Sequence, residues 1–304
     1  MVELVIASGK GGTGKTSLVG SFAALAKNAV LVDCDVDAAN LNLIIRHRIV
    51  EKNDFSSSSK ASIIDGKCTS CGICKDKCRF EAIFFEHGLS PVPYYINPLL
   101  CEGCGLCKQL CADDAIAFEP LKSGEWFRSE SEYGPFFHAR LGVAQANSGK
   151  LVSLLRTRAR EMAEKSNIDL ILIDGPPGIG CPVIASITGA AYLVIVTEPS
   201  LSAIHDMKRL AELAGHFKIG IGLCVNKYDI NIELTEQIER YAESAGIQLH
   251  GRIPFDMGFN EAQLEGKPYT LVVSRNSSRV IADIWESIKN RMQMIENEAL
   301  KNKV

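Results

Sequence analysis

The stretch GKGGTGKT, residues 9–16, follows directly on the apolar run VELVIAS of residues 2–8. It satisfies G-x-x-x-x-G-K-[ST], the pattern of a phosphate-binding loop when it connects a strand to a helix. We predict that strand at residues 2–8 and that helix at residues 15–27. The glycines let backbone amides converge on phosphate oxygens, and the helix presents its positive end to them. The stretch therefore predicts a nucleotide-binding α/β fold.

The chemistry of this loop assigns a role to individual side chains. Lys15 is expected to neutralise the β- and γ-phosphates, and the Thr16 hydroxyl is expected to bind Mg²⁺. The residues expected to bind the nucleotide here are Gly9, Lys10, Gly11, Gly12, Thr13, Gly14, Lys15, Thr16 and Ser17.

Carboxylates follow two further apolar runs. Asp33 and Asp35 lie in LVDCDVDAANLNL, and Asp174 ends LILID and is followed by GPPGIG. Carboxylates at such strand ends can hold Mg²⁺ through its water shell and orient the attacking water. An aspartate that merely begins a turn is the alternative for Asp174, which the glycine- and proline-rich loop after it makes less attractive.

Apolar runs alternate with amphipathic stretches over much of the chain. We expect strands at residues 29–33, 170–174, 191–196, 219–225 and 249–253. This alternation predicts a mainly parallel, doubly wound sheet covered by helices on both faces. Apolar residues at helical spacing predict a helix at 279–302, packed on the core rather than on a membrane.

Eight of the eleven cysteines form two quartets with the spacing C-x2-C-x2-C-x3-C. In this arrangement three cysteines wrap one 4Fe-4S cluster and the fourth serves a second cluster. One cluster is then expected on Cys68, Cys71, Cys74 and Cys111, and the other on Cys101, Cys104, Cys107 and Cys78. Zinc is the alternative, although zinc sites usually combine two short C-x2-C pairs that are separated by a longer stretch of sequence. Disulfides fit poorly, because nothing marks a secreted protein.

The cysteines interrupt the strand and helix alternation. We expect a P-loop domain at residues 1–50 and 136–304, a flexible joint at the serine-rich 51–62, a two-cluster insert at 63–119 and a return linker at 120–135. The quartets start 33 residues apart, which indicates an internal duplication. Residues 63–119 resemble a bacterial two-cluster ferredoxin, an α+β fold, except that Arg79 and Ala112 stand where proline usually follows the fourth cysteine.

The second lysine of the loop, Lys10, makes KGGTGKT resemble the deviant P-loop of the MinD/ParA ATPases, which include the nitrogenase iron protein and the Mrp-type cluster carriers. The resemblance covers the chain outside the insert and implies ATP hydrolysis in a nucleotide-dependent homodimer. It implies that Lys10 reaches the partner subunit's phosphates and that Asp35 positions water. It also implies that Thr16, Asp33 and Asp174 serve Mg²⁺.

The same resemblance extends to residues around the adenine base and to the first switch loop, at Asp35. Asn40 matches a family asparagine near that switch. VNKYD and IPFD resemble the segments around the adenine, which suggests Asn226, Pro254 and Phe255 as contacts; Asn226 could equally be a turn residue. With its insert, the chain is most similar to the cluster-bearing MinD-like ATPases associated with the orange protein complex of anaerobes.

Three cysteines lie outside the quartets. Cys34 and Cys224 fall in apolar strand patterns and are interpreted as core residues. Cys181 follows GPPGIG and begins a helix, where a thiolate is favoured. It could bind a cluster shared between subunits, or it could be an interface residue without metal.

Composition narrows the functions further. A net charge of −3 offers no basic field, so no nucleic acid is expected, and no apolar run is long enough for a membrane span. We expect a cytoplasmic protein that keeps its thiols reduced. The leading hypothesis is an ATPase that couples a dimer switch to electron transfer or Fe-S cluster delivery to a protein partner. A spatial organiser whose clusters are structural or redox-sensing is the main alternative, and a small-molecule amidation or synthesis enzyme is a third.

Overall fold

The computed structural model describes residues 1–88, 92–142, 148–272 and 276–301. The chain divides into two compact units. One contains Met1–Asn53, Glu125–Leu141 and the described part of Asn147–Val304, and the other contains Asp54–Gly124.

A nine-stranded sheet has the order β11-β10-β9-β1-β8-β2-β7-β6-β3. Its strands are β1 (Val2–Ser8), β2 (Val30–Asp33), β3 (His47–Ile63), β6 (Ile116–Ser131), β7 (Gly134–Leu141), β8 (Leu170–Pro177), β9 (Tyr192–Thr197), β10 (Gly220–Asn226) and β11 (Gln248–Ile253). From β11 to β7 neighbouring strands pair in parallel. The expectation of an α/β fold with a mainly parallel sheet is confirmed, and the strand ends differ from the predicted ones by a few residues.

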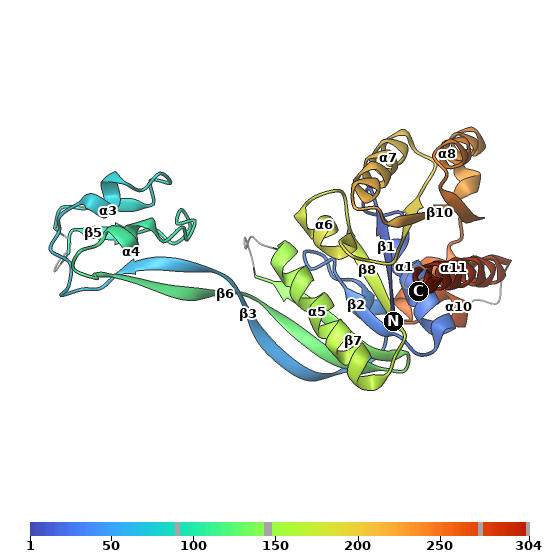
Figure 1. Ribbon diagram of the computed structural model, residues 1–304, viewed down its shortest axis with the longest axis horizontal. Helices are drawn as coiled ribbons and strands as arrows, with labels where there is room; N and C mark the ends of the chain where they lie inside the picture. Colours follow the sequence, from blue (N-terminus) through green and yellow to red (C-terminus); the bar gives the residue numbers. More distant parts are fainter. Residues whose placement is uncertain (89–91, 143–147, 273–275, 302–304) are drawn as a thin grey trace. The chain divides into compact units, whose positions relative to one another are not determined.

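Helices cover both faces of this sheet (Figure 1). The longer ones are α1 (Lys15–Ala26), α5 (Ser148–Ser166), α7 (Leu201–His216), α8 (Ile232–Ser244) and α11 (Asn276–Lys301). The shorter ones are α2 (Leu41–Ile44), α6 (Cys181–Ile187), the 3-10 turn η1 (Tyr228–Ile230), α9 (Gly258–Leu264) and α10 (Tyr269–Val272).

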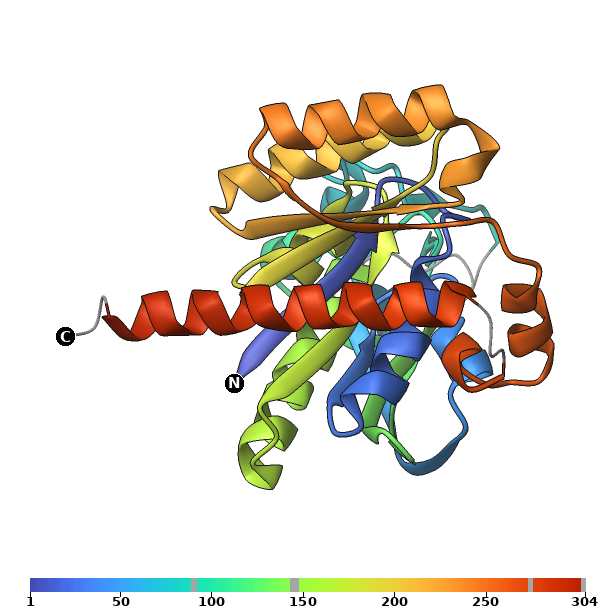
Figure 2. The same cartoon turned by 90° about the vertical axis from the view of Figure 1, so that its right-hand side faces the viewer.

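Helix α11 lies across the sheet beside α1 (Figure 2). Its buried residues Ile281, Ile284, Trp285 and Ile288 join the same apolar core as Phe22 of α1. The rings of Trp285 and Phe22 stack with their centroids 5.3 Å apart. Burial of this stripe accounts for the helix, because an amphipathic helix gains most of its stability from packing. The prediction of a core-packed terminal helix is confirmed.

The segments expected to be a flexible joint (51–62) and a return linker (120–135) are different in the structure. Residues 51–62 lie within β3, and most of 120–135 lies within β6 and the start of β7. The serine-rich composition was misleading, because β3 and β6 are neighbouring strands joined by a series of ion pairs. These are Arg48–Glu130 at 2.9 Å, Glu51–Arg128 at 3.1 Å, Lys52–Glu125 at 2.9 Å and Asp54–Lys122 at 2.7 Å.

The cysteine-bearing unit has little regular structure. It contains the short helices α3 (Ile73–Asp76) and α4 (Leu106–Leu110) and the antiparallel pair β4 (Ile83–Phe85) and β5 (Tyr94–Ile96). Its small apolar core includes Ala61, Ala82, Cys101 and Ile116.

The backbone of this unit repeats itself with the 33-residue offset of the quartets. Gly72 and Gly105, which precede α3 and α4, both have positive φ angles, 79° and 77°. Glu81 and Asp114, each three residues after a fourth cysteine, have φ angles of 52° and 49°. Left-handed backbone is uncommon for residues other than glycine, so its recurrence at matched positions shows a duplicated local fold.

Candidate functional site

The loop of residues 9–14 connects β1 to α1 and borders a cavity of about 580 Å³. Gly14 has a φ angle of 87°, and a Cβ atom there would collide with the Asn226 amide. The cavity is also lined by Asp35 and Asn40 after β2, by Pro176 and Pro177 at the end of β8, and by residues of α9. It therefore lies where β1, β2, β8 and β10 reach their carboxyl ends, the usual ligand position in open α/β sheets.

Lys15 is buried at the floor of this site, with 6% of its side chain exposed. Its Nζ lies 2.5 Å from Asp174 Oδ1 and donates to Thr16 Oγ1 at 3.3 Å. Burial alone would lower the pKa of Lys15, but the carboxylates of Asp174, Asp33 and Asp35 outweigh it and raise that pKa. Lys15 is thus held charged, as a phosphate-binding lysine must be.

Asp33 is fully buried and accepts hydrogen bonds from two backbone amides, Asp35 N at 3.0 Å and Leu41 N at 3.1 Å. Burial, followed by the nearby Asp174 carboxylate, raises the pKa of Asp33 to about 8. The pKa of Asp35 is raised as well, chiefly by burial. The site concentrates negative charge that one lysine does not fully neutralise.

A hydrated Mg²⁺ ion fits this group of residues. Asp174 Oδ2 is buried and has no hydrogen-bond partner among the described residues. An unpartnered buried carboxylate oxygen is costly unless a cation or an ordered water meets it. Oxygen ligands with retained water are what Mg²⁺ prefers, and Thr16, Asp33 and Asp174 supply such oxygens.

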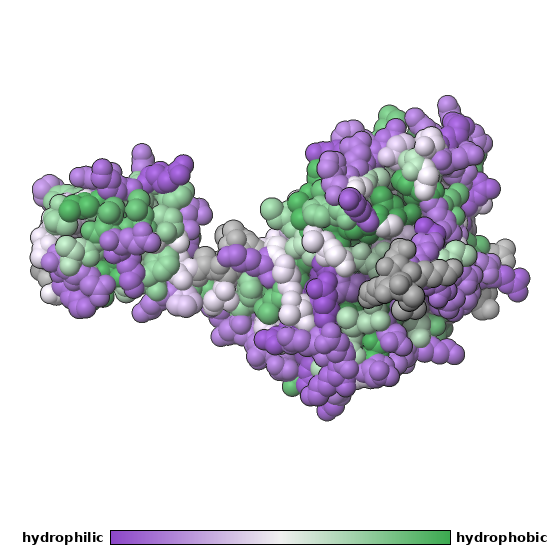
Figure 3. Space-filling view, viewed as in Figure 1, coloured by the Kyte–Doolittle hydropathy of each residue, from purple (hydrophilic) through white to green (hydrophobic). Residues whose placement is uncertain are grey.

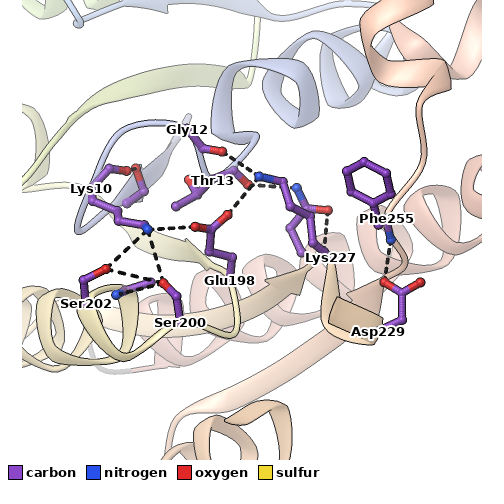
Figure 4. A network of polar contacts seen from close by, with 12 residues as sticks. Lys10, Gly12, Thr13, Glu198, Ser200, Ser202, Lys227, Asp229 and Phe255 are labelled. Atoms are coloured by element: carbon purple, nitrogen blue, oxygen red, sulfur yellow. Dashed lines mark hydrogen bonds and ion pairs between the residues drawn. The ribbon is translucent and has the colours of Figure 1, made fainter. Parts of the chain in front are cut away.

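Lys10 does not line the cavity. Its Nζ turns toward the loop after β9, 2.8 Å from Glu198 Oε1, and donates to Ser200 Oγ at 3.2 Å and Ser202 Oγ at 3.4 Å (Figure 4). Within one chain this lysine is therefore occupied by protein groups.

The residues expected near the base are only partly brought together. Asn226 is buried, lines the cavity, and donates from Nδ2 to Thr13 O at 2.8 Å, so it supports the loop directly. Phe255 lines the cavity, and its backbone N donates to Asp229 Oδ1 at 2.7 Å. Pro254 and Gly9 are not among the lining residues.

Sequence reasoning missed two residues of this site, Glu198 and Lys227. Lys227 Nζ donates to Gly12 O at 2.9 Å and lies 2.8 Å from Glu198 Oε2 (Figure 4). Glu198 directly follows the last residue of β9, and Lys227 directly follows the last residue of β10. The rule that pointed to Asp33 and Asp174, a polar residue at a strand's carboxyl end, also applies to these two.

In the cysteine-bearing unit, each predicted set of four thiols borders its own cavity. One cavity is lined by Cys68, Cys71, Cys74 and Cys111. A second is lined by Cys78, Cys101, Cys104 and Cys107, together with Cys74. Each cavity thus receives cysteines from both quartets.

The spacing of these thiols bears on which metal group they suit. Within the described residues, no three His, Cys, Asp or Glu side chains converge closely enough to hold a single metal ion. A zinc ion would need its sulfurs about 2.3 Å from one point. The four thiols of each predicted set therefore border a cavity and do not meet at a single point.

The other cysteines differ in exposure. Cys34 and Cys224 are fully buried, which agrees with their interpretation as core residues. Burial raises the pKa of both thiols, that of Cys224 to about 12, so neither is activated. Cys181 is exposed and begins α6, as expected.

Apolar side chains gather on the visible face of the cysteine-bearing unit (Figure 3). Among the described residues of this unit, the large exposed hydrophobic ones are Ile73, Phe80, Phe85, Tyr95, Leu99, Leu100, Leu106 and Leu110. Across the described parts of the chain, none of the helices combines the length and the apolar character that crossing a bilayer requires.

Comparison with known proteins adds a family and a fold. Residues 4–269 match the family described as CobQ/CobB/MinD/ParA nucleotide binding domain. The uncharacterized protein MJ0578 of Methanocaldococcus jannaschii is 37% identical over 246 residues, which cover 76% of this chain and 80% of that protein.

More distant relatives have named functions. The septum site-determining protein MinD of Synechocystis sp. is 25% identical over 278 residues, covering 88% of this chain and 81% of that protein. The iron-sulfur cluster carrier protein of M. jannaschii is 26% identical over 142 residues, covering 41% of this chain and 49% of that protein. The structure of MinD from Pyrococcus horikoshii with Mg-ADP matches with a TM-score of 0.56 at 17% identity, covering 97% and 98% of the two chains. This last likeness shows a shared fold.

Proposed function

Since the chain belongs to the CobQ/CobB/MinD/ParA nucleotide binding domain family, we propose that it is an ATP-hydrolysing iron-sulfur protein. It couples a nucleotide-dependent dimer switch to electron transfer or cluster delivery to a protein partner. The observation that carries this proposal is the presence in one chain of a phosphate loop with buried carboxylates and of two cavities lined by the two predicted cysteine sets.

The nucleotide half of the proposal rests on the loop and its carboxylates. With nucleotide bound, Lys15 would bind the β- and γ-phosphates in place of Asp174 Oδ1. Thr16, Asp33 and Asp174, whose Oδ2 has no partner among the described residues, would hold the hydrated Mg²⁺ that neutralises phosphate charge. Asp35, which lines the cavity, orients the attacking water. ATP and water then give ADP, phosphate and a proton.

The proposed dimer rests on Lys10. Its Nζ contacts Glu198, Ser200 and Ser202 rather than the cavity of its own chain. When a second copy binds, this lysine exchanges these contacts for the phosphates of that copy, where it neutralises the charge that grows on the transferred phosphoryl group. Hydrolysis is therefore slow in the monomer and faster in the dimer.

The redox half rests on the eight thiols. We assign one 4Fe-4S cluster to Cys68, Cys71, Cys74 and Cys111, and the other to Cys78, Cys101, Cys104 and Cys107. When bound, such clusters supply one-electron redox chemistry. The exposed apolar residues of this unit offer a contact surface for the protein partner that receives electrons or clusters. The iron-sulfur cluster carrier among the relatives supports cluster binding by this type of scaffold.

The test is anaerobic purification followed by iron analysis and electron paramagnetic resonance of the reduced protein, with and without MgATP. We expect about eight iron atoms per chain and a spectrum or potential that changes on adding MgATP. The control is Lys15→Ala, which should keep the iron and lose the response to MgATP. Zinc or no metal in the eight thiols would overturn the redox half and leave a nucleotide hydrolase.

A second candidate is a spatial organiser, in which ATP toggles only dimerisation and surface attachment. The coverage of 88% of this chain by the septum site-determining MinD supports this alternative. The same experiment separates the two. If the cluster signals are intact but do not change with MgATP, and the chain still dimerises with ATP, the result favours the spatial organiser.

A further inference from the structure

The carboxylate of Glu198 joins two lysines that belong to different parts of the nucleotide site. Oε1 lies 2.8 Å from Lys10 Nζ, and Oε2 lies 2.8 Å from Lys227 Nζ. Lys227 also donates to the carbonyl of Gly12, at 2.9 Å, so the same carboxylate is connected to the phosphate loop (Figure 4). Both lysines outweigh the effect of burial and lower the pKa of Glu198, which keeps it charged.

A hydrogen bond and close packing hold the backbone around Lys10, whereas its side chain is partly exposed. Ser8 Oγ donates to Lys10 O at 2.8 Å. Gly9 packs so closely on α7 that a Cβ atom there would lie 2.5 Å from the Asp206 backbone. Since 30% of the Lys10 side chain is exposed, its ammonium group can leave Glu198 without any movement of the loop.

We propose that Glu198 is a positioning residue that retains Lys10 within its own subunit until a second nucleotide-bound copy offers phosphate oxygens. This inference rests on the proposed nucleotide-dependent dimer. Glu198 and the partner's phosphates compete for one ammonium group, so the strength of the Lys10–Glu198 pair sets the protein concentration at which the dimer forms.

The partial exposure of both side chains limits the strength of the Lys10–Glu198 ion pair. Side chains that are 30% and 18% exposed form a pair of modest strength, which a polyphosphate with several negative charges can outcompete. Lys227 adds to this by sharing the carboxylate and weakening its hold on Lys10. After Lys10 leaves, Glu198 stays paired with Lys227 and no buried charge is left alone.

The test measures dimerisation of the full, cluster-loaded chain by sedimentation velocity with a saturating non-hydrolysable ATP analogue. Glu198→Gln removes the charge that holds Lys10 in each of the two copies. We expect the dimer dissociation constant to fall by about tenfold, from about threefold per copy. Glu198→Ala should shift it in the same direction, and iron content and thermal melting report whether each variant is folded.

Two control variants test whether the change in the dissociation constant depends on net charge alone and whether it requires Lys10. Glu286→Gln, which neutralises the Glu286–Lys289 pair on α11 (2.7 Å), changes the net charge equally and should leave the constant unchanged. In a Lys10→Ala background, Glu198→Gln should have no effect, because no lysine remains to be released.

The experiment distinguishes a failure of the proposed dimer switch from a failure of the positioning role of Glu198. If the wild-type chain forms no dimer with the analogue, the proposed switch fails and the inference fails with it. If the wild-type dimer forms but Glu198→Gln leaves its dissociation constant unchanged or raises it, the positioning role is wrong and the switch stands. A shift that persists in the Lys10→Ala background also overturns the positioning role.

Discussion

Asp33 and Asp174 lie opposite each other on the neighbouring parallel strands β2 and β8, and both side chains are fully buried. Two adjacent buried carboxylates repel each other. Burial and this repulsion by Asp174 raise the pKa of Asp33 to about 8. Lys15 offsets part of the charge from one side. A further cation at this pair, which we propose to be Mg²⁺, would offset the remaining charge.

Replacing Asp174 with asparagine should abolish productive Mg²⁺ binding. The variant keeps the size of the side chain but loses the charge that pairs with Lys15 and the free oxygen that we assign to the Mg²⁺ shell. We expect ATP hydrolysis to fall by at least about 100-fold. A Mg²⁺ titration of the hydrolysis rate measures the effect.

Asp169→Asn, beside the opposite end of β8, is the matched control and should hydrolyse ATP at the wild-type rate. A variant Asp174→Asn with unchanged Mg²⁺ dependence would remove this carboxylate from the metal site.

Serine substitutions can test the crossed assignment of the cysteines. Cys71→Ser and Cys111→Ser alter the same cavity although they lie in different quartets, so they should damage the same cluster. Cys104→Ser and Cys78→Ser should damage the other. Electron paramagnetic resonance of the remaining cluster should give one spectrum for the first pair and a different one for the second.

Cys181→Ser serves as the control in this series and should retain the wild-type iron content. The crossed assignment is wrong if Cys111→Ser instead gives the spectrum of Cys104→Ser.

Trp285→Ala should strongly destabilise the nucleotide-binding unit. Trp285 is fully buried in the core and stacks on Phe22, so its truncation leaves a large cavity. We expect the free energy of unfolding to fall by about 3–5 kcal/mol, measured by chemical denaturation. Trp285→Phe should cost much less, because it keeps a ring and removes an indole N–H that has no partner among the described residues.

Met294→Ala on the exposed side of the same helix, where 56% of the residue is accessible, should change the unfolding free energy by less than about 0.5 kcal/mol. A comparable loss in both variants would show that α11 is not anchored by its buried stripe.

His250 should make the protein sensitive to mild acid. Burial, and then the charge of Arg291, lowers the pKa of His250 to about 4 from its ordinary value of 6.5. The unfolded chain binds the proton more readily, so the free energy of unfolding is undiminished above about pH 6.5 and falls as the pH drops toward 4. The full difference corresponds to about 3 kcal/mol.

Unfolding measured in denaturant at several pH values should show a smaller acid-induced loss in His250→Gln, whose amide can still bond Tyr192 and Ser287. His216→Gln, on an exposed helix end, should keep the wild-type pH dependence. An identical slope in all three proteins would contradict the assignment to His250.

The sequence predicted the parallel sheet well because its strands are apolar runs that end in chemically distinctive residues. Asp33 and Asp174 could be assigned to one edge of the sheet from the sequence alone, since parallel strands share a direction. The prediction failed at residues 51–62, where four consecutive serines resemble a linker. There the chain forms β3 by pairing with β6, and pairing between distant segments leaves no local pattern. Cross-strand ion pairs such as Glu51–Arg128 accompany this pairing.

In the functional site, too, the features with a local sequence motif could be predicted and those that depend on distant contacts could not. The loop and the cysteine sets follow from motif spacing, but the position of the Lys10 side chain does not. It depends on Glu198, more than 180 residues away, and a contact of that kind appears only when β9 and β1 are placed side by side.

The cysteine-bearing unit contains two repeats that share left-handed positions and complete each other's cavities. Each cavity takes most of its cysteines from one repeat and completes its lining from the other. A lone 33-residue copy would therefore enclose neither cavity. Removing either repeat should open both cavities at once, so neither repeat can be lost without the other.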